Sequence, residues 1–365
     1  MPNRTRPRPA AAAKPAVEPF VLNGLKVRAG ERRTVDLPVT DLSTHTPMTM
    51  PVQVVHGRRP GPRLFVCAAL HGDEIVGVEI IRRLLRLSAL DRLAGTLVAV
   101  PIVNVFGFVA LSRCLPDRRD LNRSFPGSAR GSLAGRLANL FLSEIVAKTT
   151  HGIDLHTGAV HRPNYPQIRV HFDDAEALRM AEAFGVPLVV NAGFRDGSLR
   201  LAAAERQVPV IVYEAGEALR FDEAAIRAGV RGIVQVMRTI GMLRGGKTKG
   251  RRLDPILARS SSWERAPISG ILRAGVALGA RVEAGDWLGV VSDPFGESDV
   301  DVQAREGGVI IGRTNLPVVH EGDALFHIVR VEGTQATAEA LDAFEPELDY
   351  QQGLTSELSD EPPVV

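Results

Sequence analysis

The chain has 365 residues, 45% of them hydrophobic, and a formal net charge of +2. This length suits two domains with tails, and the small net charge argues against a nucleic-acid-binding protein, whose basic residues would dominate one face. No run of eighteen apolar residues occurs in the sequence, and its start lacks the apolar segment of a signal peptide. We therefore expect a cytoplasmic protein whose partners include neither nucleic acid nor membrane.

After strand-like segments within residues 21–55, a predicted strand and a predicted helix surround a short polar stretch. Residues 1–18 are rich in proline, alanine and arginine, which predicts a disordered tail. Residues 64–69 form an apolar run that predicts a fully buried strand, and apolar residues at helical spacing after the polar stretch predict a helix. His71 and Glu74 lie at this junction, so both side chains can point to one spot above the sheet edge. Asp73, between them, is expected to cap the helix.

Strand and helix patterns alternate further along the chain. Strand-like segments cover residues 95–103, 187–190 and 208–213, another strand ends at His156, and helical periodicity covers residues 131–147 and 224–240. This alternation predicts an α/β/α sandwich with a mixed, largely parallel central sheet over residues 19–243. In such sheets the chemistry lies outside the strand ends, where His71, His156 and Glu214 all fall.

The remainder of the chain predicts a second, all-β unit. Residues 244–266 begin with a glycine-rich, basic segment and are expected to form a linker. An internal repeat follows in residues 267–331, and its copies are offset by 37 residues, counted from Gly285 to Gly322. Each copy offers two strands around a Gly-Asp turn, which predicts a small barrel-sandwich domain similar to the biotinyl/lipoyl type. The carrier function needs a lysine, and none occurs after residue 249, so we expect a lid or a contact in a homo-oligomer.

The C-terminal residues 332–365 carry nine acidic side chains and no basic one. This charge pattern predicts a tail that is at least partly disordered.

Three polar residues form a candidate metal site. His71, Glu74 and His156 provide two imidazoles and a carboxylate, which suit zinc and leave a fourth position for water. Glu214, at the end of a buried strand, is the best-placed general base for that water. Asp154 lies two residues before His156, and its carboxylate could hold the imidazole of a ligand histidine in place.

The polar loop over residues 113–127 offers groups for the substrate. Asn122 and Arg123 place a neutral donor beside a guanidinium, and this pair suits a substrate carboxylate. Arg113 is a candidate for stabilising the oxyanion that forms when a carbonyl is attacked. His161 and Tyr165 follow the third ligand and could contact substrate.

The motifs together resemble a known family. The segments 71–74 (HGDE), 120–127 (DLNRSFPG), 154–157 (DLHT) and 214–216 (EAG) resemble, in order, those of the succinylglutamate desuccinylase/aspartoacylase family in the zinc carboxypeptidase clan. The resemblance spans roughly residues 50–240, and the C-terminal barrel is also similar to the extra domain of these enzymes. It implies one zinc ion on His71, Glu74 and His156, with Glu214 as catalytic base. It also implies a substrate carboxylate on Asn122 and Arg123, and we expect Asp120 to support the site beside Asp154.

These observations lead to a functional hypothesis with two alternatives. The favoured function is a zinc-dependent deacylase that cleaves a small N-acyl amino acid-like substrate with metal-activated water. A metallocarboxypeptidase that uses the same chemistry on a peptide or an amino-acid conjugate is the nearest alternative. A non-catalytic metal-binding assembly protein is the second. Taken singly, each residue also has a structural interpretation: His156 as a hydrogen-bonded histidine, Glu214 as a helix cap and Arg123 as a surface cation.

Overall fold

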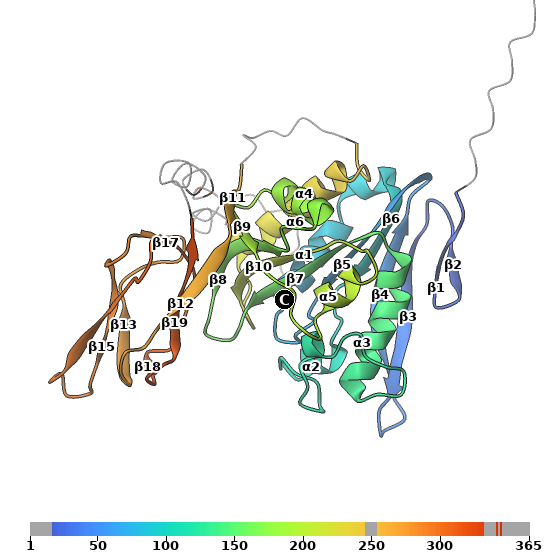
Figure 1. Ribbon diagram of the computed structural model, residues 1–365. Coiled ribbons are helices and arrows are strands. Elements are labelled where there is room, and N and C mark those ends of the chain that lie inside the picture. Colours follow the sequence, from blue (N-terminus) through green and yellow to red (C-terminus); the bar gives the residue numbers. More distant parts are fainter. Residues whose placement is uncertain (1–16, 245–253, 332–340, 342–343, 345–365) are drawn as a thin grey trace, which may run out of the picture.

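The computed structural model describes residues 17–244 and 254–331, together with residues 341 and 344. A 13-stranded mixed sheet runs through the molecule in the order β12-β19-β17-β8-β10-β7-β5-β6-β4-β3, with β9, β11 and β14 attached off this path (Figure 1). The strands of its N-terminal part, with the separate hairpin β1-β2, are β1 (Phe20–Leu22), β2 (Leu25–Val27), β3 (Arg32–Asp41), β4 (Pro47–His56), β5 (Arg59–Ala68), β6 (Ala94–Val100), β7 (His151–Gly158), β8 (Asn164–Val170), β9 (Leu188–Asn191) and β10 (Val210–Glu217).

The centre of the sheet is parallel, because β5 pairs in parallel with β6 and β7, and β7 with β10. Antiparallel strands flank it: β4 beside β6, and β8 beside β10. Each residue of β6 is buried, as expected for a parallel strand that helices cover on both faces. The predicted fold class is therefore confirmed.

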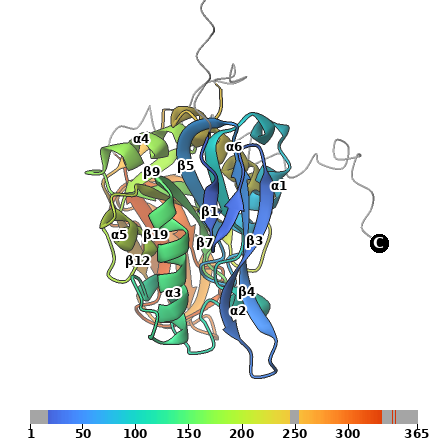
Figure 2. The same cartoon turned by 90° about the vertical axis from the view of Figure 1, so that its right-hand side faces the viewer.

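Helices cover both faces of the sheet (Figures 1 and 2). Their bounds are α1 (Val76–Leu85), α2 (Val105–Val109), α3 (Leu133–Glu144), α4 (Ala175–Phe184), α5 (Leu199–Ala204) and α6 (Glu223–Thr239), with 3-10 turns at Ser88–Arg92, Leu121–Arg123 and Val146–Lys148. Residues of α1, α4 and α6 share one hydrophobic core with Leu64 and Val66 of β5. Residues of α2, α3 and α5 share the other core with Phe65 and Cys67. The alternation along β5 therefore divides two cores, and the functional residues lie on the α2/α3/α5 side.

The C-terminal part contributes strands to two sheets: β11 (Ile256–Ala258), β12 (Ser260–Arg265), β13 (Gly270–Ala274), β14 (Arg281–Val282), β15 (Trp287–Ser292), β16 (Asp299–Gln303), β17 (Gly308–Arg313), β18 (Val318–Val319) and β19 (Ala324–Arg330). Strands β16, β15, β13 and β18 form a four-stranded sheet, and the others extend the central sheet. The expected linker at 244–266 thus differs from the structure, where β11 pairs with β9 and β12 with β19. Both pairings join segments that are far apart in sequence, so no local sequence pattern predicts them. The two-domain division stays a prediction.

The internal repeat has a matching structure in its two copies. Gly285 and Gly322 both have positive φ values, 92° and 85°, which glycine adopts at little cost. The carboxylates of Asp286 and Asp323 accept the backbone N–H three residues earlier, from Glu283 and His320. Each copy's first strand pairs with the other copy's second strand, since β13 pairs with β18 and β17 with β14. The repeat therefore closes into a small sandwich with its own hydrophobic core.

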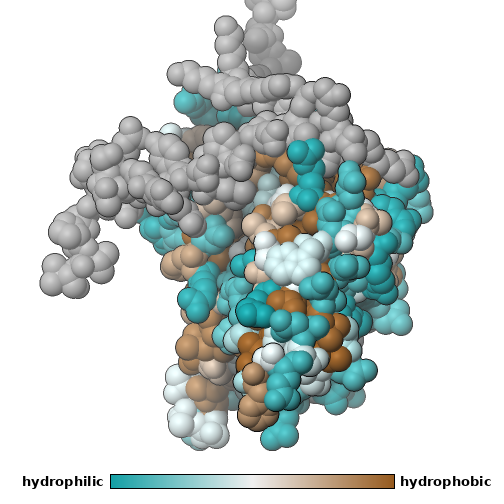
Figure 3. All heavy atoms as spheres, turned by 90° about the vertical axis from the view of Figure 1, so that its left-hand side faces the viewer, coloured by the Kyte–Doolittle hydropathy of each residue, from teal (hydrophilic) through white to brown (hydrophobic). Residues whose placement is uncertain are grey.

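The outer face of this sandwich carries hydrophobic side chains among hydrophilic ones (Figure 3). Ile271, Trp287 and Val318, on strands β13, β15 and β18, are exposed. Homo-oligomer formation remains a prediction.

The predicted disordered tail 1–18 and acidic tail 332–365 lie almost wholly outside the described residues. Phe344 is described, and its buried ring meets Tyr165 edge-on. Among the described helices, none is long and apolar enough to span a membrane.

Candidate metal centre and its cleft

The loop between β5 and α1 presents His71 and Glu74. Ala69, which opens it, has a left-handed φ of 49°, an unusual conformation for a residue with a side chain. At Gly72 a Cβ atom would lie 2.0 Å from the carbonyl carbon of Gly107, so only glycine allows α2 to approach this loop. The helix begins at Val76, two residues after the start near Glu74 that the sequence predicts. Asp73 does not cap it, since the N-cap position is Ile75 without a side-chain hydrogen bond.

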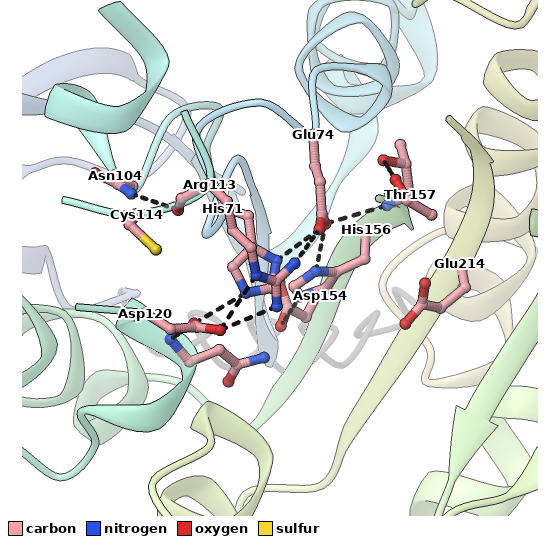
Figure 4. A network of polar contacts seen from close by, with 12 residues as sticks. His71, Glu74, Asn104, Arg113, Cys114, Asp120, Asp154, His156, Thr157 and Glu214 are labelled. Carbon is pink, nitrogen blue, oxygen red and sulfur yellow. Dashed lines mark hydrogen bonds and ion pairs between the residues drawn. The ribbon is translucent and has the colours of Figure 1, made fainter. Parts of the chain in front are cut away.

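Three predicted ligands meet in a buried cluster (Figure 4). One ligand atom each from His71, Glu74 and His156 lies within 4.8 Å of the other two, and all three residues are buried. His71 Nδ1 lies 2.7 Å from Glu74 Oε1, and His156 Nδ1 lies 2.6 Å from Glu74 Oε2. Segments 82 residues apart in sequence thus bring two imidazoles to one carboxylate.

The Nε2 atom of each imidazole, on the side of the ring away from Glu74, also faces a carboxylate. His156 Nε2 lies 2.8 Å from Asp154 Oδ2, and His71 Nε2 lies 3.1 Å from Asp120 Oδ1. Proteins use this arrangement to orient histidine ligands and to increase their basicity, leaving the other ring nitrogen free for a metal. The donor set, with both Nδ1 atoms facing Glu74, therefore fits a zinc ion.

The charges in the cluster shift the pKa values of its members. Burial lowers the pKa of His156, but the carboxylates of Asp154 and Glu74 outweigh it and raise that pKa well above its usual range. Burial also lowers the pKa of His71. The carboxylates of Glu74 and Asp120 outweigh this effect, so the pKa of His71 is raised. Burial raises the pKa of Glu74, yet the two histidines outweigh it and hold the pKa of this carboxyl well below its usual range. We therefore expect these residues to form an ion-paired network when no metal is bound.

Arg113 borders the cluster. Its Nη1 donates to Glu74 Oε1 at 3.1 Å, while Nε and Nη2 donate to Asp120 Oδ2 at 3.3 and 3.0 Å. A guanidinium has five N–H donors, so these three hydrogen bonds leave two for another oxygen. Asp120 thus contacts both His71 and Arg113, and its supporting role stays a prediction.

Glu214 lies beside the third ligand. It pairs in register with His156 on β7 and with Gln167 on β8, so its side chain shares the sheet face of His156. Asn164 Nδ2 donates to Glu214 Oε2 at 2.8 Å. The second oxygen, Oε1, lies 3.6 Å from Nε of Arg169.

Asn122 and Arg123 lie across the cleft on the 3-10 turn Leu121–Arg123. The backbone N–H of Leu199 donates to Asn122 Oδ1 at 2.9 Å, which fixes the amide so that Nδ2 is the end available to a ligand. Arg123 Nη1 donates to the carbonyl of Asn122 at 2.6 Å. Gly197 holds this turn closely, because a Cβ there would lie 2.5 Å from the carbonyl oxygen of Arg123.

These residues line one cleft of about 160 Å³. Its walls also include Arg169, Arg195 and Arg200, which sequence reasoning missed. Their signal was weak: Arg169 alternates with apolar residues in a strand, and the other two fall in an ordinary polar loop and helix start. His161 and Tyr165 do not line the cleft; the Tyr165 side chain packs into the core instead.

The three additional arginines repel one another. Burial lowers the pKa of Arg200 to about 10, and the charges of Arg169 and Arg195 add to this effect. Burial, Arg123 and Arg169 lower the pKa of Arg195 in the same direction. Within the described residues, no hydrogen-bond acceptor meets the buried Arg169 Nε or Arg200 Nη1. The cleft is therefore cationic and would be stabilised by an anion.

Comparisons with known proteins identify a family and several relatives. The model of the succinylglutamate desuccinylase/aspartoacylase catalytic domain matches residues 60–240. The chain is 29% identical over 343 residues to an N-alpha-acetyl-L-2,4-diaminobutyric acid deacetylase from Halomonas elongata, a match that covers 90% of this chain and 97% of the relative.

Solved structures share the fold. A succinylglutamate desuccinylase/aspartoacylase from Rhodobacter sphaeroides has a TM-score of 0.74 at 24% identity, over 82% of this chain and 96% of the other. The product-bound ectoine utilization protein from Ruegeria pomeroyi has a TM-score of 0.73 at 23% identity, over 82% and 95%.

Proposed function

Because the chain belongs to the succinylglutamate desuccinylase/aspartoacylase family, we propose that it is a zinc-dependent deacylase. Its substrate is an N-acylated amino acid or a related small carboxylate, and the bond cleaved is the amide. The general activity, hydrolysis of an amide bond by a deacylase, is supported by the family and by the deacetylase relative. The zinc ion, one per chain, and the substrate class are the parts that need testing.

One observation carries the proposal. The buried cluster of His71, Glu74 and His156 and the carboxylate of Glu214, on the adjacent strand β10, line the same cleft. His71, Glu74 and His156 would hold the ion. A bound zinc ion polarises a carbonyl and lowers the pKa of water.

Glu214 performs the proton transfers. Its carboxylate accepts a proton from the attacking water as the new carbon–oxygen bond forms. Protonated Glu214 then gives this proton to the amide nitrogen as the carbon–nitrogen bond breaks, which yields a carboxylic acid and an amine. The acid passes its remaining proton to the amine, leaving a carboxylate and an ammonium group. Arg113 supports the negative charge on the attacked oxygen with the donors that Glu74 and Asp120 leave free.

The charge and size of the cleft support a small anionic substrate. Asn122 Nδ2 and the Arg123 guanidinium suit a carboxylate, and the arginine can grip it through two hydrogen bonds. A volume of about 160 Å³ suits a small molecule or the terminal residue of a peptide. The deacetylase relative favours the deacylase over the metallocarboxypeptidase alternative.

The decisive experiment combines Glu214→Gln with metal analysis. Glutamine keeps the shape of the side chain but cannot accept the proton, so zinc content should persist while kcat falls about 10²–10⁴-fold. Glu205→Gln, the same change at an exposed glutamate of the surface, serves as the control and should keep wild-type activity. Near-normal turnover by zinc-loaded Glu214→Gln would contradict the assignment of the base.

The substrate is best found with a panel of N-acetyl, N-succinyl and N-formyl amino acids beside short peptides. Turnover of the acylated amino acids supports the deacylase. Faster release of C-terminal residues from peptides would favour the carboxypeptidase. Metal binding with no turnover across the panel would favour the assembly protein.

A further inference from the structure

The C-terminal strand β17 reaches the residue that holds the proposed base. Asn164, the first residue of β8, lies between two strands, because it pairs with Gly216 of β10 and with Gly312 of β17. Its amide Nδ2 donates to Glu214 Oε2 at 2.8 Å. One amide therefore connects the C-terminal part of the chain with the cleft.

Gly312 leaves space for this amide. A Cβ atom at position 312 would lie 3.1 Å from Asn164 Oδ1 and 3.4 Å from the Cβ atom of His327. The first distance is shorter than an ordinary van der Waals contact, so a side chain here would displace the Asn164 amide. The backbone of Gly312 does not have a positive φ, so alanine can adopt it and its effect would be steric.

The loop after β17 is tied to the catalytic part independently. Asn315 donates its backbone N–H to the carbonyl of His161 at 2.7 Å, and its Nδ2 to Glu217 Oε2 at 3.1 Å. Glu217 Oε1 in turn accepts the N–H of His161 at 3.0 Å. These bonds join the loop before Asn164 to the end of β10 and to the loop after β17, so the position of Gly312 relative to β8 is well defined.

We propose that Asn164 is a positioning residue for the base Glu214. We also propose that β17 keeps the Asn164 amide in place, because Gly312 has no side chain that would displace it. The inference rests on the proposed function, in which Glu214 transfers the proton. The hydrogen bond from Asn164 holds Oε2. The other oxygen, Oε1, whose ion-pair neighbour is Arg169 at 3.6 Å, is the one that would take the proton of the attacking water. The C-terminal strands then contribute to catalysis without supplying a group that touches the substrate.

The test measures kcat, KM and zinc content for Asn164→Asp, Gly312→Ala and the double variant. Aspartate has the shape of asparagine but cannot donate and repels Glu214, so kcat should fall roughly 10- to 100-fold with zinc content unchanged. Gly312→Ala should lower kcat about three- to tenfold, since small misplacements of a catalytic group are costly. KM should change little in both. Gly307→Ala is the matched control, because its nearest neighbour would be at 3.4 Å, an ordinary contact.

The double variant separates positioning from general damage. If Gly312→Ala acts through Asn164, it should add nothing to the loss already caused by Asn164→Asp. Losses that multiply, or wild-type kcat in Asn164→Asp when Glu214→Gln is inactive, would overturn this inference alone. Near-normal turnover by Glu214→Gln would overturn the proposed base and this inference with it. If Asn164→Asp is poorly folded, Asn164→Ser, judged by kcat at wild-type thermal stability, replaces it with the same expectation.

Discussion

Acidification should release the metal from this protein steeply. Each ligand imidazole lies between two carboxylates: His156 between Glu74 and Asp154, and His71 between Glu74 and Asp120. A ring that donates from both nitrogens is an imidazolium, so the metal-free cluster stores protons on the atoms that bind metal. The pKa values of both histidines are raised accordingly.

The size of the effect follows from the number of protons displaced. Metal binding requires neutral Nδ1 atoms, so a raised pKa means that protons compete until the pH exceeds that pKa. One displaced proton weakens binding about tenfold per pH unit below the pKa, and the two histidines together about 100-fold. Above both pKa values the affinity should become independent of pH. Binding is therefore lost as the pH falls, with a slope approaching two.

Zinc titration by calorimetry measures this directly. Repeating each titration in two buffers of different ionisation enthalpy counts the protons released, and a competing chelator extends the affinity range. We expect close to two protons released at low pH and almost none at high pH. Equal affinities at about pH 6 and pH 8, with no proton release at either, would refute the argument that the imidazoles are charged in the metal-free state.

Further predictions concern the carboxylates, the arginine and the metal-free protein. Asp154→Asn should weaken zinc binding roughly 10- to 100-fold at neutral pH, and more than Asp120→Asn, because Asp154 is the more buried of the two; equal losses in a chelator assay would contradict this ranking. Arg123→Ala should reduce kcat/KM most for carboxylate substrates, with partial rescue by Arg123→Lys, which lacks the two-pronged geometry; uniform loss on all substrates would instead indicate a structural role. In the metal-free protein, the raised pKa of His156 contributes stability below the unfolded-state pKa of about 6.5. This stability is lost as the pH rises through the folded-state pKa. A metal-free Tm that does not fall on alkalinisation would disprove the ion-paired network.

The sequence alone predicted the parts of this protein that depend on local patterns. An apolar run followed by a histidine and a glutamate three residues apart predicted a strand end with two ligands, because strands and helices follow the periodicity of their own residues. The same reasoning found the strand that carries Glu214 and the Gly-Asp turns of the repeat. Two turns of identical composition at a fixed offset adopt the same left-handed glycine conformation in the structure.

Only the tertiary structure decided which distant groups share the cleft. Arg169, Arg195 and Arg200 come from three separate elements and carry no local sign of convergence. The contact of Gly312 with Asn164 depends on a strand pairing between residues 148 positions apart, counted from 164 to 312. Pairing partners and close approaches are set by how the sheet closes and how the cores pack. A sequence pattern indicates which face of a helix or strand is buried, but it does not indicate which other element packs against that face.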